Sequence, residues 1–449
     1  MTTTSPLDTY LTDFADAARD YHAARAGRDP EWIADIRAEA LDSFRELGLP
    51  TARRGNEEYK YTDIRPLVRQ GFSPLLITDR NSAVAAPDLD LDQLRIGPAE
   101  WHRVVIVDGR FAPELSAPDG LPDGIAIGSL AEGVHSDGDA VRAHLARLAD
   151  YTEHGFTALN TALAAEGALV LIPRMTAIDQ PIQVVYISTE RTQGAASMPR
   201  TLVVAGEDSS AAIVETHVST ADDAHLTNAV TEIVVGAGSN ISYCKIQQES
   251  EATYNVSTTL VEVNENANFR SMAIDIGGRL TRNNLTIIMA GEGGNSDVRG
   301  AYVITRDQHV DNQVIVDHVV GHNDMNEIYK GILDGHARSV FHGSIIVRPN
   351  AAKVNAMQVD KNLLLSNDAE ADTKPAFWIY CDDVRCGHGA ACGNLDEDAM
   401  FYLRSRGIEE EEARMMLIRA FVSEVVDAIQ EPSIHDHVAA LIATKLDNL

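Results

Sequence analysis

The chain contains 449 residues, of which 45% are hydrophobic and 23% are charged. That balance is typical of folded proteins and excludes a largely disordered chain. The 67 acidic residues outnumber the 37 Lys and Arg residues, which gives a formal net charge of −30. Because phosphate backbones and anionic bilayers repel so negative a chain, we expect neither nucleic acid nor a membrane surface as a partner.

The sequence also indicates the compartment. It has no run of roughly 18 apolar residues of the kind that spans a bilayer. Its first segment, MTTTSPLDTYLTDFADAARD, is polar and lacks the apolar stretch of a secretory signal. Four cysteines in 449 residues are too few for a disulfide framework. We therefore expect a cytoplasmic protein without a membrane segment.

Residues 1–167 are expected to form an N-terminal helical and mixed region. Apolar residues recur at helical spacing up to about residue 50. Residues 71–135 are rich in Pro, Gly and Asp and contain one clear strand, Arg103–Val107. The pattern predicts a further helical stretch over 137–165.

The pattern changes over residues 168–394, which we expect to form the core. Short runs rich in Val, Ile and Thr alternate with polar turns, and the turn centres recur about every 27–30 residues, at Gly206, Gly236, Asn264 and Gly291. Such a period is typical of stacked β structure, either a β-helix or a sandwich, and it leaves no room for βαβ crossovers. We favour a mainly β protein with a β-helix capped by helical regions at both ends.

Residues 395–449 are expected to form a C-terminal helical domain. Asp396 is placed as a helix N-cap, and Gly407 ends that first helix. A second helix is expected over 409–430 and a third over 434–446. Because three short helices cannot bury all their apolar faces, part of this domain is expected to be apolar and exposed. The apolar stripe expected on the second helix comprises Ala413, Met416, Leu417, Ala420, Phe421, Val425, Ala428 and Ile429.

The densest chemical segment is YCDDVRCGHGAACG at 380–393, which holds three of the four cysteines. Cys386 and His388 are two residues apart, so they point the same way from an extended strand. A thiolate and an imidazole on one face suit a soft or borderline metal such as iron or zinc. Two ligands do not complete a tetrahedral site. The spacing therefore favours an incomplete site that a partner chain or a transient ligand completes, and it places Cys381 on the opposite face of a straight strand.

Three other interpretations of this part of the chain stay open. Ordinary packing at a strand end is the simplest. A closed zinc site from Cys381, Cys386, His388 and Cys392 would make a self-contained metal-binding structural protein, although its spacing matches no common zinc pattern. The Asp-Asp and Gly-His-Gly motifs at 382–383 and 387–389 resemble those of β-helix polygalacturonases, which would make a carbohydrate hydrolase or lyase. Adjacent Asp side chains on a strand point to opposite faces, which argues against that enzyme.

Histidines recur before this segment, and a metal cluster or stacked turns of a solenoid would both explain their spacing. They are His309, His318, His322, His336 and His342. The chain has no GxxxxGK[ST] loop, so we expect it to bind no nucleotide itself.

Four segments of the chain resemble one known family. The longest runs from Asn362 to Phe421 and contains DDVRCGHGA and FYLRSRGI, and the others are EEYKYTDI at 57–64, FTALNTALAAEG at 156–167 and YKGILDG at 329–335. Together they are similar to SufD within the SufB/SufD family of the SUF iron–sulfur cluster assembly system. The DDVRCGHGA form favours the SufD branch, because SufB typically has a Gly-Ala-His-Thr type sequence there.

The resemblance implies a right-handed parallel β-helix between helical regions. It implies a non-catalytic scaffold subunit that pairs with a SufB-like subunit through the β-helix, or with itself when isolated, and that docks a SufC-like ATPase on residues 395–449. Cys386 and His388 match the family's Cys-x-His motif at the SufB–SufD interface. They are expected to bind a nascent Fe–S cluster or iron transiently, shared with SufB.

Overall fold

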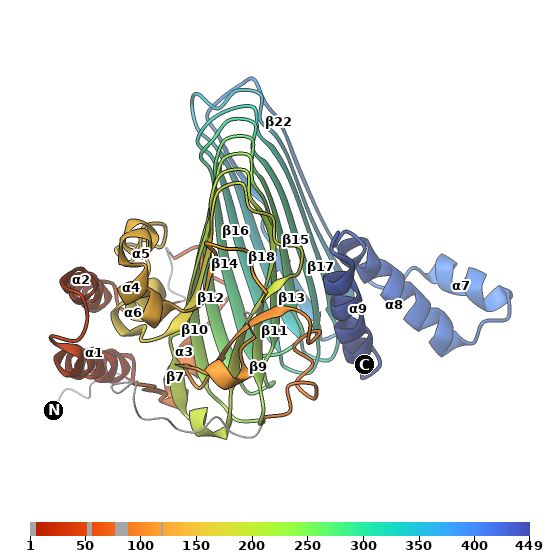
Figure 1. Ribbon diagram of the computed structural model, residues 1–449. Helices are drawn as coiled ribbons and strands as arrows, with labels where there is room; N and C mark the ends of the chain where they lie inside the picture. Colours follow the sequence, from red (N-terminus) through yellow and green to blue (C-terminus); the bar gives the residue numbers. More distant parts are fainter. Residues whose placement is uncertain (1–5, 52–55, 77–88, 118–119) are drawn as a thin grey trace.

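The computed structural model describes residues 6–51, 56–76, 89–117 and 120–449. Its centre is a parallel β-solenoid of two long facing sheets, with the N-terminal helices on one side and the C-terminal helices on the other (Figure 1). Over most of the solenoid, consecutive strands alternate between the two sheets, so each pair of strands completes one coil. This arrangement confirms the predicted mainly β fold with helical ends and excludes the sandwich.

The strands of each sheet follow one another along the solenoid axis. The twelve-stranded sheet contains β1 (Ser73–Pro74), β4 (Ala126–Ser129), β5 (Gly167–Ile172), β7 (Ala195–Ser197), β8 (Arg200–Ala205), β10 (Leu226–Val235), β12 (Tyr254–Val263), β14 (Leu280–Met289), β16 (His309–His318), β18 (Arg338–Val347), β20 (Glu370–Thr373) and β21 (Ala376–Ile379). The ten-stranded sheet contains β2 (His102–Val107), β3 (Arg110–Phe111), β6 (Ile182–Ser188), β9 (Ser210–Ser219), β11 (Asn240–Gln248), β13 (Asn268–Asp275), β15 (Asn295–Ile304), β17 (Asp324–Leu333), β19 (Asn355–Leu364) and β22 (Arg385–Gly393).

The helices lie at the two ends of the sequence and before the first coils. They are α1 (Pro6–Arg25), α2 (Glu31–Leu47), α3 (Arg65–Gln70), α4 (Leu130–Ser136), α5 (Gly138–His144), α6 (Gly155–Leu163), α7 (Glu397–Ser405), α8 (Glu410–Val426) and α9 (Pro432–Leu446), with short 3-10 helices at Pro113–Leu115 and Glu190–Thr192. Among the described residues, no helix combines the length and apolar character needed to cross a bilayer.

The coil repeat matches the period of the turns. Register partners on successive strands of the twelve-stranded sheet are 26 to 30 residues apart, and the four predicted turn centres each follow a strand of that sheet. Side chains at equivalent positions therefore stack into columns between the sheets. Each buried Val or Ile contributes about 1.5–3 kcal/mol to folding. One such column consists of Val203, Ile233, Val261, Ile287, Val316 and Ile345, all buried.

The helix predicted over 137–165 is wrong in its middle, where the chain forms a turn between α5 and α6. The cause is the buried carboxylate of Glu232 in β10. It accepts hydrogen bonds from the backbone N–H groups of residues 146–149, at 2.9–3.1 Å, and it pairs with Arg200 at 2.5 Å. A buried carboxylate needs such donors, and wrapping the backbone around it prevents a continuous helix.

The segment around residues 58–62 attaches the N-terminal region to the solenoid. The guanidinium of Arg282 lies 3.7 Å from the centre of the Tyr59 ring and donates to the Glu58 carbonyl at 3.0 Å. Both Arg282 and the hydroxyl of Thr62 hydrogen-bond the carboxylate of Asp311, and these three side chains are buried. Removal of one member would leave a buried charge without its partner, so this contact fixes the segment in place.

The C-terminal helices α8 and α9 pack on the outer face of the ten-stranded sheet (Figure 1). Lys330 of β17 anchors α8, because its ammonium pairs with Glu424, donates to the Phe421 carbonyl at 2.7 Å and lies 4.7 Å from the Phe421 ring centre. The expected stripe of α8 is partly wrong. Met416 is 46% exposed, and Ile418, which the stripe omitted, is buried against the sheet.

We predict that Lys330→Met loosens α8 without unfolding the solenoid. The variant keeps the aliphatic stem but loses the ion pair and the hydrogen bond, which together contribute about 1–2 kcal/mol at a half-exposed pair. Amide exchange in α8, measured by mass spectrometry, should become roughly 5- to 30-fold faster, while exchange in β10–β16 stays unchanged. Lys353→Met, which removes an exposed ion pair to Asp383, is the control and should leave α8 as it is.

Candidate functional site

The last coil of the solenoid is open. Its strand β22 pairs with β19 alone, and β20 and β21 pair with β18 alone, so within the described residues both sheets end there with an unpaired strand edge. The first coils end differently, since β3 and β4 pair antiparallel with β2 and β5. Large exposed side chains mark the open end, namely Met357, Trp378 and Tyr380, at 46–60% exposure.

Cys386 and His388 lie together on β22 and face the inside of this open coil. Their register partners on β19 are Ala356 and Gln358, both buried in the interior. Cys386 is half-buried against the interior core, whereas His388 is exposed. The His388 ring stacks on Phe377 of β21, with ring centres 4.2 Å apart and planes inclined by 24°. The expectation that both residues share one face of a strand near the C-terminal end of the solenoid is confirmed.

The other two cysteines of the segment lie apart from this pair. Cys381 was expected on the opposite face, but it precedes β22 in a turn and packs against the same interior core as Cys386. Strand alternation does not extend through a turn, which explains the error. Cys392 is exposed near the other end of β22, in register with Asn362. In the parts of the chain that the structure describes, no three His, Cys, Asp or Glu side chains are placed to hold a metal ion, so the closed zinc site has no geometric support.

The acidic pair does not form a glycosidase site. Asp382 and Asp383 are both exposed in the turn before β22, and Asp383 accepts a hydrogen bond from Lys353 at 2.8 Å. An acid and a base on opposite sides of a sugar need two carboxyl groups directed into one cleft. In this turn Asp383 forms a solvent-exposed ion pair with Lys353, and the two carboxyl groups do not face a common cleft.

The five histidines do not gather. His309 and His318 lie at opposite ends of β16, and burial lowers the pKa of each to about 4, so both are neutral at physiological pH. His342 bonds Gln313 at 2.9 Å, while His322 and His336 are exposed turn residues. They occupy separate positions on stacked coils, as the solenoid interpretation predicted.

Two residues behind His388 were missed by sequence reasoning. Glu327 of β17 and Gln358 of β19 are fully buried, and the Gln358 amide donates to the Glu327 carboxyl at 2.8 Å. Burial, reinforced by the negative charge of Asp360, raises the pKa of Glu327 to about 8. Burial also raises the pKa of the Cys386 thiol. A signal for Glu327 existed, because aligning the coils at their period places it two strands before His388.

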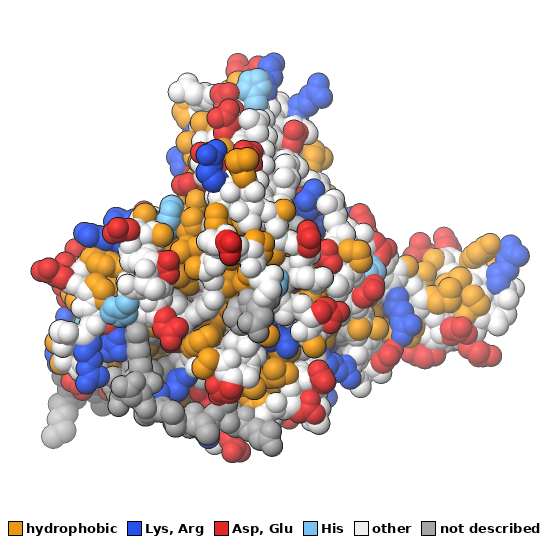
Figure 2. Space-filling view, in the orientation of Figure 1, with side chains coloured by type: hydrophobic (Ala, Val, Ile, Leu, Met, Phe, Trp, Pro, Cys, Tyr) orange, Lys and Arg blue, Asp and Glu red, His pale blue; other side chains and the backbone are white. Residues whose placement is uncertain are grey.

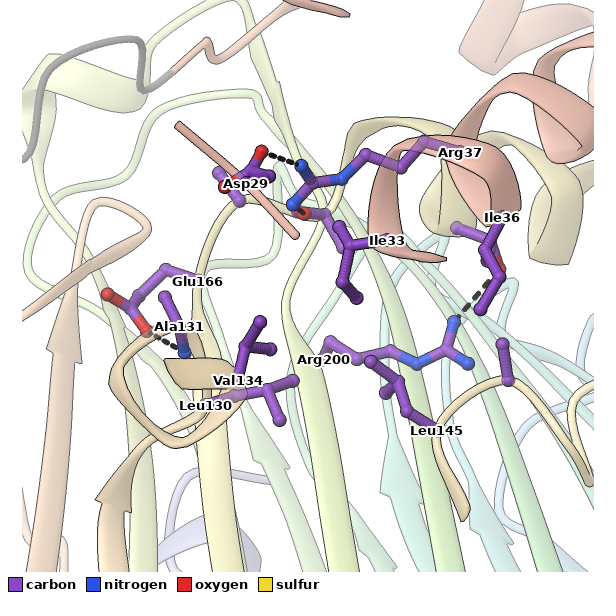
Figure 3. Close-up of a pocket in the computed structure, with 14 residues that line it drawn as sticks. Asp29, Ile33, Ile36, Arg37, Leu130, Ala131, Val134, Leu145, Glu166 and Arg200 are labelled. Atoms are coloured by element: carbon purple, nitrogen blue, oxygen red, sulfur yellow. Dashed lines mark hydrogen bonds and ion pairs between the residues drawn. The ribbon is translucent and has the colours of Figure 1, made fainter. Parts of the chain in front are cut away.

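A cavity at the seam between α2, α4 and the solenoid is the other candidate (Figure 3). It encloses about 50 Å³, room for a few water molecules, since one water needs roughly 10–15 Å³. Its charged walls are already paired: Arg37 bonds Asp29 and the Ala164 carbonyl, and Arg200 bonds Glu232 and the Thr161 hydroxyl. The cavity is too small for a nucleotide or a sugar and is a packing seam.

A second exposed surface lies on α7 and α8, which project from the solenoid and carry apolar side chains (Figure 2). Phe401 and Tyr402 of α7 are 74% and 57% exposed, and no residue of α7 is buried. Asp396 caps α7, as predicted, and accepts from the N–H groups of Asp398 and Ala399. Exposed aromatic side chains on a projecting helix are typical of a protein interaction surface.

Comparison with known proteins agrees with the resemblance in the sequence. Residues 186–421 match the family described as SUF system FeS cluster assembly, SufBD core domain, and residues 8–184 match the SufBD protein N-terminal region. The chain therefore belongs to the SufBD family of iron–sulfur cluster assembly proteins.

Relatives across bacteria cover nearly the whole chain. A SufBD family protein of Synechocystis is 28% identical, covering 94% of this chain and 92% of its own length. The iron–sulfur cluster assembly protein SufD of Escherichia coli is 29% identical, with 90% and 91% covered. The assembly protein SufB of Bacillus subtilis is 25% identical, with 89% and 86% covered.

The raised pKa of Glu327 makes stability depend on pH. In the unfolded chain the carboxyl loses its proton near pH 4.5, but the folded chain keeps it until about pH 8. Wild type should therefore lose stability relative to Glu327→Gln as pH rises between these values. Between about pH 5.5 and 7.5 the difference in unfolding free energy between the two proteins should change by roughly 2–3 kcal/mol. Urea denaturation at both pH values measures it.

The exposed-turn variant Glu292→Gln is the control for this measurement. It should follow wild type at both pH values. A difference between wild type and Glu327→Gln that stays constant with pH would mean that the buried carboxyl is ionised throughout.

Proposed function

We propose that this protein is a non-catalytic scaffold subunit on which an Fe–S cluster is assembled in the cytoplasm. The observation that carries the proposal is the pair Cys386 and His388, half a metal site on the open last coil of the solenoid. The pair supplies one thiolate and one imidazole, whereas a cluster needs several such ligands per iron-sulfur unit. The missing ligands come from a partner, and the iron or nascent cluster is cargo rather than a resident cofactor.

The partner in this proposal is a SufB-like subunit, which pairs through the open end. The unpaired edges of β20–β22 offer backbone N–H and C=O groups to another strand, and exposed edges that serve no pairing are an aggregation hazard. The exposed Met357, Trp378 and Tyr380 add apolar area around the site. When the chain is isolated, the same edge is free to pair with a second copy.

The second partner is a SufC-like ATPase, which docks on residues 395–449. The support is the exposed apolar surface of α7 and α8, on the side of the C-terminal helices that does not contact the solenoid. The chain has no P-loop of its own, so ATP hydrolysis is the role of that partner.

The competing assignment as a β-helix carbohydrate hydrolase or lyase has little support. Its acid pair lies in an exposed turn, and Asp383 of that pair is bonded to Lys353. Polygalacturonate cleavage by the isolated chain would favour it over the scaffold.

We predict that His388→Ala leaves folding and complex formation nearly intact but lowers Fe–S enzyme maturation in cells at least roughly tenfold. The ring is exposed, so its loss removes one stack on Phe377 and little else from the fold. The measurement is the activity of Fe–S enzymes in a strain that depends on this copy. His336→Ala, another exposed histidine on a turn of the solenoid, should behave as wild type. Normal maturation with His388→Ala would refute the site.

We predict that Phe401→Asp abolishes co-purification with a SufC-like ATPase, because it puts a charge in the centre of the exposed patch on α7. Complete deletion of 395–449 tests the same surface less cleanly, since α8 and α9 cover an apolar face of the solenoid. Met175→Asp, at a 72% exposed methionine in the turn between β5 and β6, is the control. If Phe401→Asp still co-purified with the ATPase, the docking surface would not include this patch.

A further inference from the structure

The interior column that ends at His388 changes character near the open coil. Val298, Glu327, Gln358 and His388 are register partners on β15, β17, β19 and β22. The first three are fully buried. The interior position is therefore apolar at β15 and polar on β17, β19 and β22. The buried polar residues Glu327 and Gln358 lie directly beneath His388, which faces the open end.

Two buried oxygen atoms in this column have no hydrogen-bond partner. Gln358 donates its Nε2 to Oε2 of Glu327, but Oε1 of Gln358 and Oε1 of Glu327 accept no hydrogen bond from any described group. A buried polar atom without a hydrogen-bond partner lowers the stability of a fold by about 1–3 kcal/mol. The strand β18 restricts the amide on its other side, since a Cβ at Gly343 would lie 1.8 Å from Nε2 of Gln358.

The register places Gln358 directly beneath His388 on the neighbouring strand. Adjacent strands are about 4.8 Å apart, so the side chain of Gln358 lies one strand spacing beneath that of His388. Phe377 covers one face of the ring at a centre distance of 4.2 Å. A stacked face fixes the ring plane and leaves both ring nitrogens, which lie at the edge, available for hydrogen bonding and for a metal.

We propose that Glu327 and Gln358 are positioning residues for His388. The carboxyl holds the amide, and the amide oxygen accepts the N–H of one ring nitrogen of His388, which leaves the lone pair of the other nitrogen free at the open coil for iron. The proposal rests on the role proposed above for His388 and extends it. Histidines that bind metals generally donate their second ring N–H to such a group, which fixes the tautomer.

The electrostatics of the column suit this role. A carboxyl whose pKa is raised to about 8 is neutral at pH 7, so it holds the amide without placing a negative charge under the metal site.

The test uses the full-length, metal-free chain labelled with ¹⁵N at histidine. The chemical shifts of the two ring nitrogens distinguish the neutral tautomers, and the His388 signals are those lost in His388→Ala. We expect one dominant tautomer in wild type and a shift toward the mixture of a free imidazole in Gln358→Met and in Glu327→Met. Both changes are nearly isosteric and apolar, so packing is retained. In the complex with the SufB-like partner, both should weaken iron binding roughly 10- to 100-fold.

Asn362→Leu is the matched control. Asn362 is another buried polar residue on β19, is uncharged, and has Cys392 rather than His388 as its register partner. Unchanged His388 shifts in Gln358→Met would overturn the proposal, and so would an equal change in Asn362→Leu, which would indicate general loosening of the last coil. If Glu327→Met fails to fold, Gln358→Met decides alone. If the positioning role of Glu327 and Gln358 is refuted, the cellular test of His388→Ala still decides the proposed function, so the two proposals can fail separately.

Discussion

Everything in this structure depends on the parallel hydrogen-bond ladder that joins one coil to the next. Each coil satisfies the backbone groups of the coil before it and presents its own to the coil after it, so the ladder has to be terminated at both ends. At the first end the two sheets finish with the short antiparallel strands β3 and β4. At the other end β20, β21 and β22 each leave one edge unpaired, and the candidate metal ligands lie on the last of them. The unpaired edge of the nine-residue strand β22 makes the last coil available for pairing with another strand.

The same ladder explains how an extended, acidic chain builds a specific interior. Columns of identical position form between the sheets, apolar in the middle, as with Ile233, Val261 and Ile287, and polar where Glu327 and Gln358 stack. Buried polar groups in such columns bond along the axis to their neighbours in adjacent coils. A change in one coil therefore first affects the packing of the coils above and below it. Helices on the outer face contact the same strands, as α8 does through Lys330.

Much of the fold was predictable from the sequence because a solenoid repeats a local signal. The spacing of the turns at Gly206, Gly236, Asn264 and Gly291 predicted the coil length, and Asp396 predicted the start of α7. Turns and helix caps depend on neighbouring residues alone, so both signals can be seen in the sequence. The wrong predictions concern segments whose structure depends on contacts with residues distant in the sequence. The carboxylate of Glu232 interrupts the helix predicted near residue 146, and contact with the sheet buries Ile418 in place of Met416. Within the site, Cys386 and His388 were found because they are two residues apart, while Gln358 lies 30 residues before His388 and is adjacent only through the register.

The composition of β22 has a mechanical consequence. The strand reads RCGHGAACG, and apart from the adjoining residues of the chain nothing described lies within 4 Å of where a Cβ would be at Gly389 or Gly393. A strand held mainly by its backbone has weakly specified register and is the easiest in a sheet to slide. Its side-chain fixed points are Cys386 in the interior and His388 on Phe377, and three residues link its end to the exposed helix α7. A pull on α7 would therefore act along β22, the strand that Cys386 and His388 hold in place.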